Sequence, residues 1–430
     1  MEKIRNDFYN ETIYKEVLDN GLTVYLMPKK GFSQYSAIFM TNYGSFDNEF
    51  IPLGERDLVK MPEGIAHFLE HKMFEMTDGS DVNDIFSNMG VEANAYTSYD
   101  RTAYTIFGTD NSLEAVELLI DFVQSPSFTD ESVDKEKSII EQELLMYLDN
   151  EKTASKIRFL KTLYGEANPI AKDIGGTVES IRQINKETLL KCYNTFYNPG
   201  NMTLVVVGGI EVESLLKMIK ENQSKKTFMK YQTIQKKKQE YFENADVIYE
   251  TSNFNISTPI VTVGFKFPYD NENVVDSSKK SFALDYLFDA YFSGYSSFTE
   301  KLRKNGLGEI NPIYSATYYS GYGFFTISTT TNKYEKFIKL VEVTIEEMLN
   351  EEFKEEKLKT LKRGIHTNFI KRFNNVQGLC NDLAELHFKG VEFFESVDLP
   401  TKVTLEDIAN AKNKIANKKL CIHVVLPNEK

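Results

Sequence analysis

The most informative stretch of the sequence, for both fold and function, is Gly64-Ile-Ala-His67-Phe-Leu-Glu70-His71-Lys-Met-Phe74. It holds two of the five histidines, four residues apart, with a glutamate directly before the second. Apolar residues recur and neither proline nor glycine occurs from Ile65 to Asp78, so the pattern predicts a helix. Side chains at i and i+4 share a helix face, so both imidazoles can bind one metal ion while Glu70 reaches a water on it. A packed or exposed pair without metal is the alternative.

A second stretch, from Glu136 to Tyr147, offers a further ligand. Catalytic zinc takes three protein ligands and keeps one position for water. The stretch is typical of a helix, and Glu136 and Glu143 lie two turns apart on one face, whereas Glu141 lies on another. Two carboxylates on a buried face need a cation or hydrogen bonds. The alternative is a solvated acidic stripe, because charged side chains are mostly exposed.

Several ordered motifs in the first half accompany these residues. The chain resembles the pitrilysin, insulinase and mitochondrial processing peptidase family of zinc peptidases, and within it the bacterial YmfH-type branch. The segments that carry the resemblance are Gly64–Phe74, Asn94–Ser98, Thr102–Tyr104, Glu136 with Glu143, Asp173–Ile181 and Phe196–Met202. A chance match of the histidine motif is therefore a weak explanation.

The resemblance assigns a role to each site residue. It implies that His67, His71 and Glu143 bind one Zn²⁺ per chain, that Glu70 is the general base, and that Glu136 supports the site from beside the ligands. The implied function is a zinc-dependent endopeptidase that hydrolyses short unfolded peptides, including precursor or leader peptides. The alternative is a non-catalytic or partner-dependent subunit that binds peptides as a scaffold.

The run from Val91 to Ile106 is rich in Thr, Tyr and Ala and predicts a pair of strands. In the family, the strand that matches Asn94, Ala95 and Tyr96 is an edge that the substrate backbone joins. Such strand addition recognises main-chain groups and is largely indifferent to sequence. The alternative is an ordinary inner strand with Tyr96 and Tyr104 in the core.

The chain is long enough for two domains and carries signs of an internal duplication. With 430 residues it exceeds one hydrophobic core. The segments 128–150 and 353–375 align, and a polar, lysine-rich stretch at 221–243 separates the halves. We expect a zinc-binding domain at 1–220, a solvated linker at 221–243 and a homologous domain at 244–430. Each should be an α+β domain with a mostly antiparallel sheet and helices on one face, and the resemblance implies half of a peptidase clamshell.

The second half lacks the metal set. If Gly90 aligns with Gly306, the positions opposite His67, Glu70 and His71 hold residues that do not bind zinc well, namely Ala283, Tyr286 and Leu287. The family's substrate-binding arginine matches Arg303, but its tyrosine position is Ile310, and Tyr314 lies four residues beyond. Either Tyr314 substitutes or a partner completes the site. We therefore expect a dimer, and favour a heterodimer with a related zinc-less subunit.

Composition sets the outer limits. The net charge of −13 argues against nucleic-acid binding. No apolar run is long enough to cross a membrane, so no membrane partner is expected. The N-terminus lacks the apolar core of a signal peptide. Three widely separated cysteines (Cys192, Cys380 and Cys421) fit buried free thiols in a reducing, cytoplasmic setting.

Overall fold

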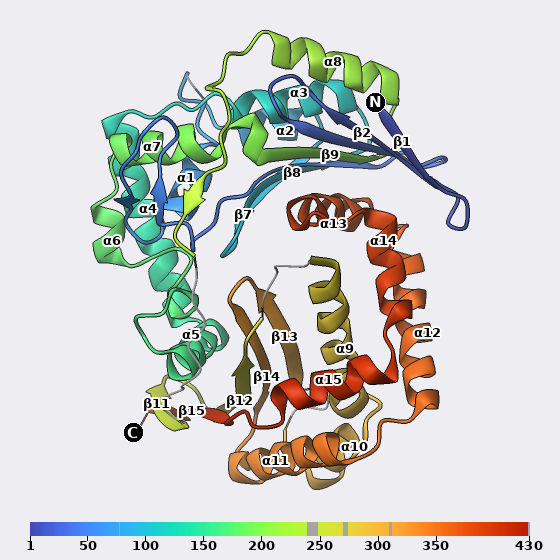
Figure 1. Cartoon of the computed structure of the whole chain (residues 1–430). Helices are drawn as coiled ribbons and strands as arrows, with labels where there is room; N and C mark the ends of the chain where they lie inside the picture. Colours follow the sequence, from blue (N-terminus) through green and yellow to red (C-terminus); the bar gives the residue numbers. More distant parts are fainter. Residues whose placement is uncertain (77, 239–247, 270–273, 309–311, 429–430) are drawn as a thin grey trace. The chain divides into compact units, whose positions relative to one another are not determined.

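Two β-sheets organise the chain, each inside one compact unit (Figure 1). The computed structural model describes residues 1–76, 78–238, 248–269, 274–308 and 312–428. Unit 1 consists of Met1–Leu144, Asp173–Lys238 and Ile370–Phe394, and unit 2 of Leu145–Lys172, Gln239–Phe369 and Glu395–Lys430. Both units combine sheet and helices, which confirms the expected α+β class.

The sheet of unit 1 has the strand order β1-β2-β3-β9-β4-β8-β7 among the described residues. Its strands are β1 (Glu2–Asn6), β2 (Glu11–Val17), β3 (Thr23–Pro28), β4 (Tyr35–Thr41), β7 (Glu92–Thr97), β8 (Thr102–Gly108) and β9 (Met202–Gly208). Neighbours run antiparallel, except that β3 and β9 run parallel. A short sheet beside it pairs β5 (Glu49–Ile51) with β6 (Val59–Lys60) and β10 (Gln235–Lys236).

The sheet of unit 2 has the order β11-β15-β12-β14-β13. Its strands are β11 (Tyr249–Phe254), β12 (Ile260–Phe267), β13 (Ile313–Tyr319), β14 (Tyr322–Thr330) and β15 (Cys421–Pro427). Only the described β11–β15 pair is parallel, so both sheets are mostly antiparallel, as expected.

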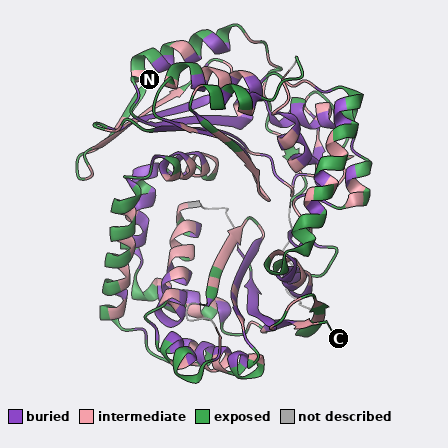
Figure 2. Cartoon of the chain, turned by 180° about the vertical axis from the view of Figure 1, so that it is seen from behind, coloured by how far each residue is buried: buried purple, intermediate pink, exposed green. Residues whose placement is uncertain are grey.

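In unit 1 helices cover both faces of the sheet, where the sequence led us to expect them on one face. In unit 1, α3 (Ser112–Val123) contacts β4 and β8, while α13 (Val376–Lys389) contacts β4 and β9 from the opposite face (Figure 1). In unit 2, α5 (Glu151–Tyr164) contacts β12 and β15, and α9 (Val274–Phe292) contacts β13. The physical reason is that β4, β9 and β12 are buried along their whole lengths and need cover on both sides (Figure 2).

The covering helices are exchanged between the two halves of the sequence. Helix α5 comes from the first half and belongs to unit 2, whereas α13 comes from the second half and belongs to unit 1. The compact units therefore differ from the expected domains at 1–220 and 244–430. An amphipathic helix specifies that it must cover an apolar face, but its sequence does not say which sheet provides that face.

The exchanged helices support the duplication. Helix α4 (Asp130–Asp149) precedes α5, and α12 (Glu355–Arg372) precedes α13. Asn150 caps α5 by accepting a hydrogen bond from the Thr153 amide, and Asn375 caps α13 in the same way from the Gly378 amide. The other described α-helices are α1 (Ile65–Lys72), α2 (Val82–Asn88), α6 (Val178–Arg182), α7 (Lys186–Phe196), α8 (Val212–Ser224), α10 (Ser297–Asn305), α11 (Tyr334–Asn350), α14 (Phe393–Asp398) and α15 (Leu405–Ile415). None of these described helices has the length and apolarity that a membrane span requires.

The expected linker at 221–243 is partly built into unit 1. Lys236 pairs with Phe50 in the short sheet, and its Nζ lies 2.9 Å from Asp47 Oδ2. Lys237 forms an ion pair with Glu49 at 3.0 Å. The lysine run is therefore not a purely solvated one, because two of its charges meet carboxylates; residues 239–243 lie outside the described part of the chain.

Candidate metal centre

Helix α1 presents the two histidines of the opening motif. Gly64 directly before it has a φ of 85°, and a Cβ there would lie 2.2 Å from the Gly175 carbonyl oxygen, so only glycine fits. The apolar face of Ile65, Phe68 and Leu69 is fully buried. This anchoring fixes the opposite face, on which His67 and His71 lie one turn apart with ring centroids 4.6 Å from each other.

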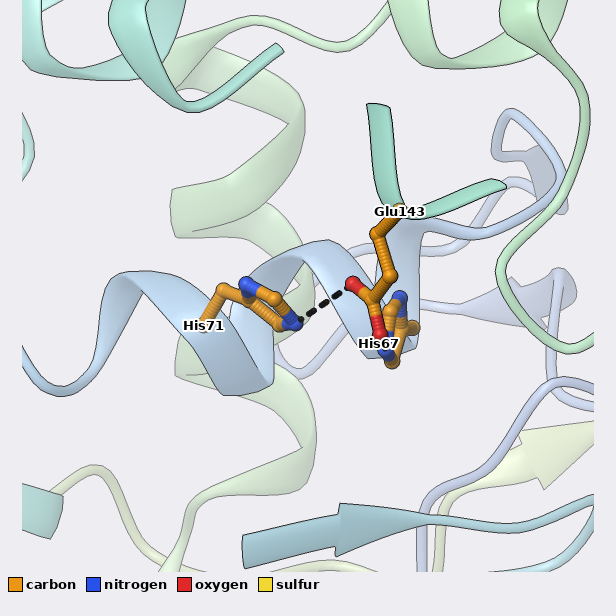
Figure 3. A group of neighbouring side chains, drawn as sticks. All are labelled: His67, His71 and Glu143. Carbon is orange, nitrogen blue, oxygen red and sulfur yellow. Dashed lines mark ion pairs between the residues drawn. The ribbon is translucent and has the colours of Figure 1, made fainter. Parts of the chain in front are cut away.

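Helix α4 brings Glu143 to the two imidazoles (Figure 3). Glu143 Oε2 lies 3.2 Å from His71 Nε2, and Oε1 lies 3.9 Å from His67 Nε2. One nitrogen from each imidazole and one carboxylate oxygen lie within 4.8 Å of one another. The separation of 3.9 Å is too long for a hydrogen bond, so the carboxylate and His67 face each other without sharing a proton.

Glu136, two turns earlier on α4, meets the far side of His71. Its Oε1 lies 3.1 Å from His71 Nδ1. A proton on Nδ1 leaves the lone pair on Nε2, the nitrogen that faces Glu143. Imidazoles that bind metals are commonly oriented in this way by a carboxylate behind them.

The two histidines have opposite electrostatic settings. Burial, followed by the neighbouring His71, lowers the pKa of His67 to about 4, so this imidazole is neutral at pH 7. Burial alone would also lower the pKa of His71, but hydrogen bonds to Glu136 and Glu143 outweigh it and raise the pKa to about 10. The carboxylates thus create a place that favours positive charge beside a neutral imidazole, which suits a divalent cation.

The ligand chemistry of this cluster fits zinc. Two imidazole nitrogens and one carboxylate oxygen form a three-ligand set that catalytic zinc sites use, with a fourth position for water. Among the described residues, these three form the one group of histidines, cysteines and acids close enough to hold an ion. The acidic-stripe alternative for α4 does not describe Glu136 and Glu143, because both side chains are mostly buried against histidines.

Glu70 lies on α1 between the histidines and is almost completely buried. Its Oε2 accepts a hydrogen bond from Thr97 Oγ1 at 2.5 Å. Burial raises the pKa of Glu70, and the Thr97 hydroxyl opposes that rise. Thr97 is a residue that sequence reasoning missed, although its place at the end of the edge-strand motif was a usable signal.

Strand β7 lies at an edge of the unit 1 sheet and, among described strands, pairs with β8 alone. Asn94, Ala95 and Tyr96 are all on it, and the inner-strand alternative is therefore wrong. Ala95 and Thr97 point toward the core and α1, while Tyr96 points to α13, where its hydroxyl donates to Asn381 Oδ1. Asn94 Oδ1 accepts from the Ala95 amide at 2.8 Å.

The two candidate substrate residues of the second half lie in unit 2. Arg303 is exposed on α10. Tyr314 is half-buried on the edge strand β13, and its hydroxyl donates to Asp289 Oδ1 at 2.8 Å. Ile310 lies outside the described residues. The positions expected to replace the ligands are core residues, since Ala283, Tyr286 and Leu287 are all buried.

Comparison with known proteins agrees with this geometry. Residues 50–175 match the family described as Insulinase (Peptidase family M16), and residues 183–365 match Peptidase M16 inactive domain. The chain is 36% identical to the protein named Uncharacterized zinc protease YmfH of Bacillus subtilis, across 99% of both proteins. The chain belongs to the M16 peptidase family. The family of zinc proteases named by the resemblance is thereby confirmed.

Solved structures show the same fold. An M16-like peptidase from Alicyclobacillus acidocaldarius is 30% identical, with a TM-score of 0.91 over 97% of this chain and 99% of that one. Pitrilysin is 17% identical with a TM-score of 0.76, and the similarity covers all of this chain but 47% of pitrilysin. The pitrilysin match concerns the fold alone, and it shows that a longer M16 chain contains this fold within about half of its length.

Proposed function

We propose that this M16 protein is a zinc-dependent endopeptidase in which His67, His71 and Glu143 bind one Zn²⁺ and Glu70 is the general base. The observation that carries the proposal is the convergence of the three ligand atoms within 4.8 Å. The buried carboxylate of Glu70 lies on the helix that bears both histidines. All four of these residues are present in the chain.

The chemistry divides between the ion and the chain. A bound zinc ion supplies a Lewis acid that acidifies water and polarises a peptide carbonyl. Glu70 removes the proton from the attacking water and passes it to the departing amine. Because Thr97 occupies Oε2, Oε1 is the oxygen that accepts this proton. Glu136 keeps the His71 ring in the orientation that presents Nε2.

The proposed substrates are short unfolded peptides, including precursor or leader peptides, bound as an added strand beside β7. The support is the position of β7 at the edge of the sheet, next to the helix that bears Glu70. An extended peptide that pairs with Asn94, Ala95 and Tyr96 would be recognised through its backbone. Most backbone groups of a folded protein already pair with one another, so an unfolded peptide offers a free backbone more readily.

A partner-dependent enzyme is the second candidate. Two observations favour it: the match of residues 183–365 to a domain described as inactive, and the chain's equivalence to about half of pitrilysin. In this version the chain works as a dimer, with Arg303 and Tyr314, or a zinc-less partner's equivalents, completing the peptide site. The cysteines are buried thiols, which supports a cytoplasmic location as part of the same proposal.

Peptide hydrolysis by the purified chain tests the function. We would incubate a mixed pool of unstructured peptides with the protein and with Glu70→Gln, and identify products by mass spectrometry. Zinc content of both proteins is measured in parallel. We expect one zinc per chain in each and cleavage by the wild type alone.

The other outcomes separate the candidates. Zinc binding without cleavage, followed by cleavage once a partner from native cells is added, supports the partner-dependent enzyme. Absence of zinc from the wild-type protein contradicts both candidates and favours a peptide-binding scaffold. Native mass spectrometry gives the subunit composition, and a lone 49.4 kDa species removes the dimer from the proposal.

A further inference from the structure

A network of polar side chains joins edge strand β7 to helix α13. Arg101, in the turn between β7 and β8, contacts both oxygens of Asp100 at 2.8 and 2.9 Å. Arg101 Nη1 also lies 2.8 Å from Glu385 Oε1 on α13. On the same helix, Asn381 accepts the Tyr96 hydroxyl and donates Nδ2 to Glu385 Oε1 at 3.0 Å. Strand, turn and helix are therefore connected through one continuous set of hydrogen bonds.

The network is buried enough to be persistent. The Arg101 side chain is 13% exposed and that of Glu385 31% exposed. Burial alone would raise the pKa of Glu385, but Arg101 and Lys389 outweigh it and lower the pKa, so the carboxylate stays ionised. Removing one partner of such a pair leaves the other charge poorly solvated. The contact between turn and helix is thus more than a weak surface salt bridge.

The turn is held from a second side as well. The amides of Ser45 and Phe46 donate to the carbonyl oxygens of Ser98 and Tyr99 at 3.1 and 2.8 Å. A Cβ on Gly44 would lie 2.5 Å from the backbone of Tyr99 and Asp100, so the two loops touch directly. Thr97, which holds Glu70, is the residue directly before this turn. Loss of the contact to α13 would therefore loosen the strand proposed to pair with the peptide, while Ser45 and Phe46 still hold the turn beside Thr97.

We propose that α13 positions β7 for peptide binding, through Glu385 and Asn381. The half of the sequence that lacks metal ligands thereby contributes positioning residues to the unit that has them. We call the contacts of Arg101 and Tyr96 with Glu385 and Asn381 the tether. The expected effect on peptide binding rests on the proposed peptidase function, but the tether itself is a property of unit 1. Arg101, Asn381 and Glu385 act on the substrate only through β7.

The test compares Glu385→Gln with Asp382→Asn in the full chain. Both remove one carboxylate charge from α13, but Asp382 pairs with Arg372 at 3.1 Å and does not bond to the β7–β8 hairpin. Hydrogen exchange of residues 92–101 reports on the hairpin without any need for activity. Steady-state hydrolysis of an unstructured peptide from the pool that the wild type cleaves separates KM from kcat. Glu385→Asp, which keeps the charge, serves as the conservative variant.

For Glu385→Gln we expect the hairpin amides to exchange faster and KM to rise about tenfold with kcat within about twofold, since lost positioning weakens binding before chemistry. Zinc content should not change. Asp382→Asn should match the wild type, and Glu385→Asp should lie between. Unchanged exchange in Glu385→Gln, or equal changes in both variants, overturns the tether. If the wild type cleaves no peptide, the hydrolysis measurement contradicts the proposed peptidase function. Hydrogen exchange of the hairpin still tests the tether in that case.

Discussion

Helices α1 and α9 occupy corresponding places in the two halves, yet α1 carries two of the proposed metal ligands and α9 contributes to a packed core. The glycines that follow the next helix in each half, Gly90 and Gly306, both have positive φ values of 71° and 57°, which supports the alignment. On α1 two of the three aligned positions are partly exposed histidines facing a carboxylate, and the third is the buried Glu70. On α9 they are buried apolar or aromatic residues. The same backbone place can therefore serve binding or packing, depending on what faces it.

Helix α9 also differs from α1 in the carboxylates that it presents to its edge strand. Asp285 and Asp289 lie one turn apart and accept hydrogen bonds from Tyr318 and Tyr314 of the edge strand β13, at 2.7 and 2.8 Å. Burial raises the pKa of Asp285 to about 7. In unit 1, Thr97 of the corresponding edge strand donates a hydrogen bond to Glu70 on α1. Each edge strand thus bonds to a carboxylate on its helix, but only in unit 1 does that carboxylate adjoin histidines.

The largest contrast should come from His71→Ala and Leu287→Ala. His71→Ala removes a proposed ligand, so we expect loss of zinc and of all hydrolysis, with little change from the wild type in the Tm of the metal-free protein. Leu287→Ala removes a buried side chain, so we expect a cost of about 2–5 kcal/mol in the free energy of unfolding, with zinc content unchanged. Metal analysis and denaturant unfolding measure the two effects. Similar behaviour of both variants would show that the alignment of α1 with α9 has no functional meaning.

A smaller effect is expected at Thr97. Thr97→Val keeps the shape of the side chain but removes the hydroxyl that holds Glu70. We expect kcat to fall about tenfold, which corresponds to a loss of about 1.4 kcal/mol of transition-state stabilisation, with zinc content unchanged. Thr97→Ser retains the hydroxyl and should keep most of the activity. Equal losses in both variants would assign the effect to packing of the methyl group instead.

The pH dependence of the free energy of unfolding should reveal the raised pKa of Asp285 on α9. An aspartate whose pKa is about 7 when folded and about 3.9 when unfolded binds more protons in the folded state between these values. The Asp285 carboxyl therefore favours the folded state more at low pH, and this contribution to the free energy of unfolding is lost as pH rises from about 4 to about 7. We expect Asp285→Asn, which keeps an acceptor for Tyr318, to gain on the order of 1–2 kcal/mol over the wild type at pH 8. Urea unfolding at pH 5 and pH 8 measures it, and an equal gain at both would contradict the assignment.

The smallest effects should be the matched helix caps. Asn150→Ala and Asn375→Ala each remove a side chain that accepts an amide hydrogen bond at the start of an exchanged helix. Each should cost about 1 kcal/mol in the free energy of unfolding. Thermal unfolding of the two single variants and the double variant provides the comparison. A large effect from one cap and none from the other would mean that the two exchanges differ in their importance for stability.

The sequence predicted the site more completely than the arrangement of elements around it. Helical spacing placed His67 beside His71 and Glu136 on the face of Glu143, because these relations are local. The edge position of β7 came from the family resemblance. The exchange of α5 and α13 could not be predicted from the sequence pattern or from the resemblance, since helical amphipathicity identifies a buried face without naming its partner. The bond from Thr97 to Glu70 joins separate elements and depends on the fold itself. The roles of Arg303 and Tyr314 stay predictions.

The exchange of α5 and α13 has a consequence for how the chain is made. Strand β9 ends at Gly208, but α13, which covers it, begins only at Val376. A chain emerging from the ribosome therefore carries one uncovered face of the first sheet until most of its synthesis is complete. In the finished protein, Cys380 of α13 contacts this face, with its Sγ 3.0 Å from the Ser36 carbonyl oxygen. Until α13 is made, the face is open to chaperones and to misassembly. Truncation anywhere before α13 should leave an aggregation-prone fragment, so the ligand-less half also acts as the last step that makes the first half soluble.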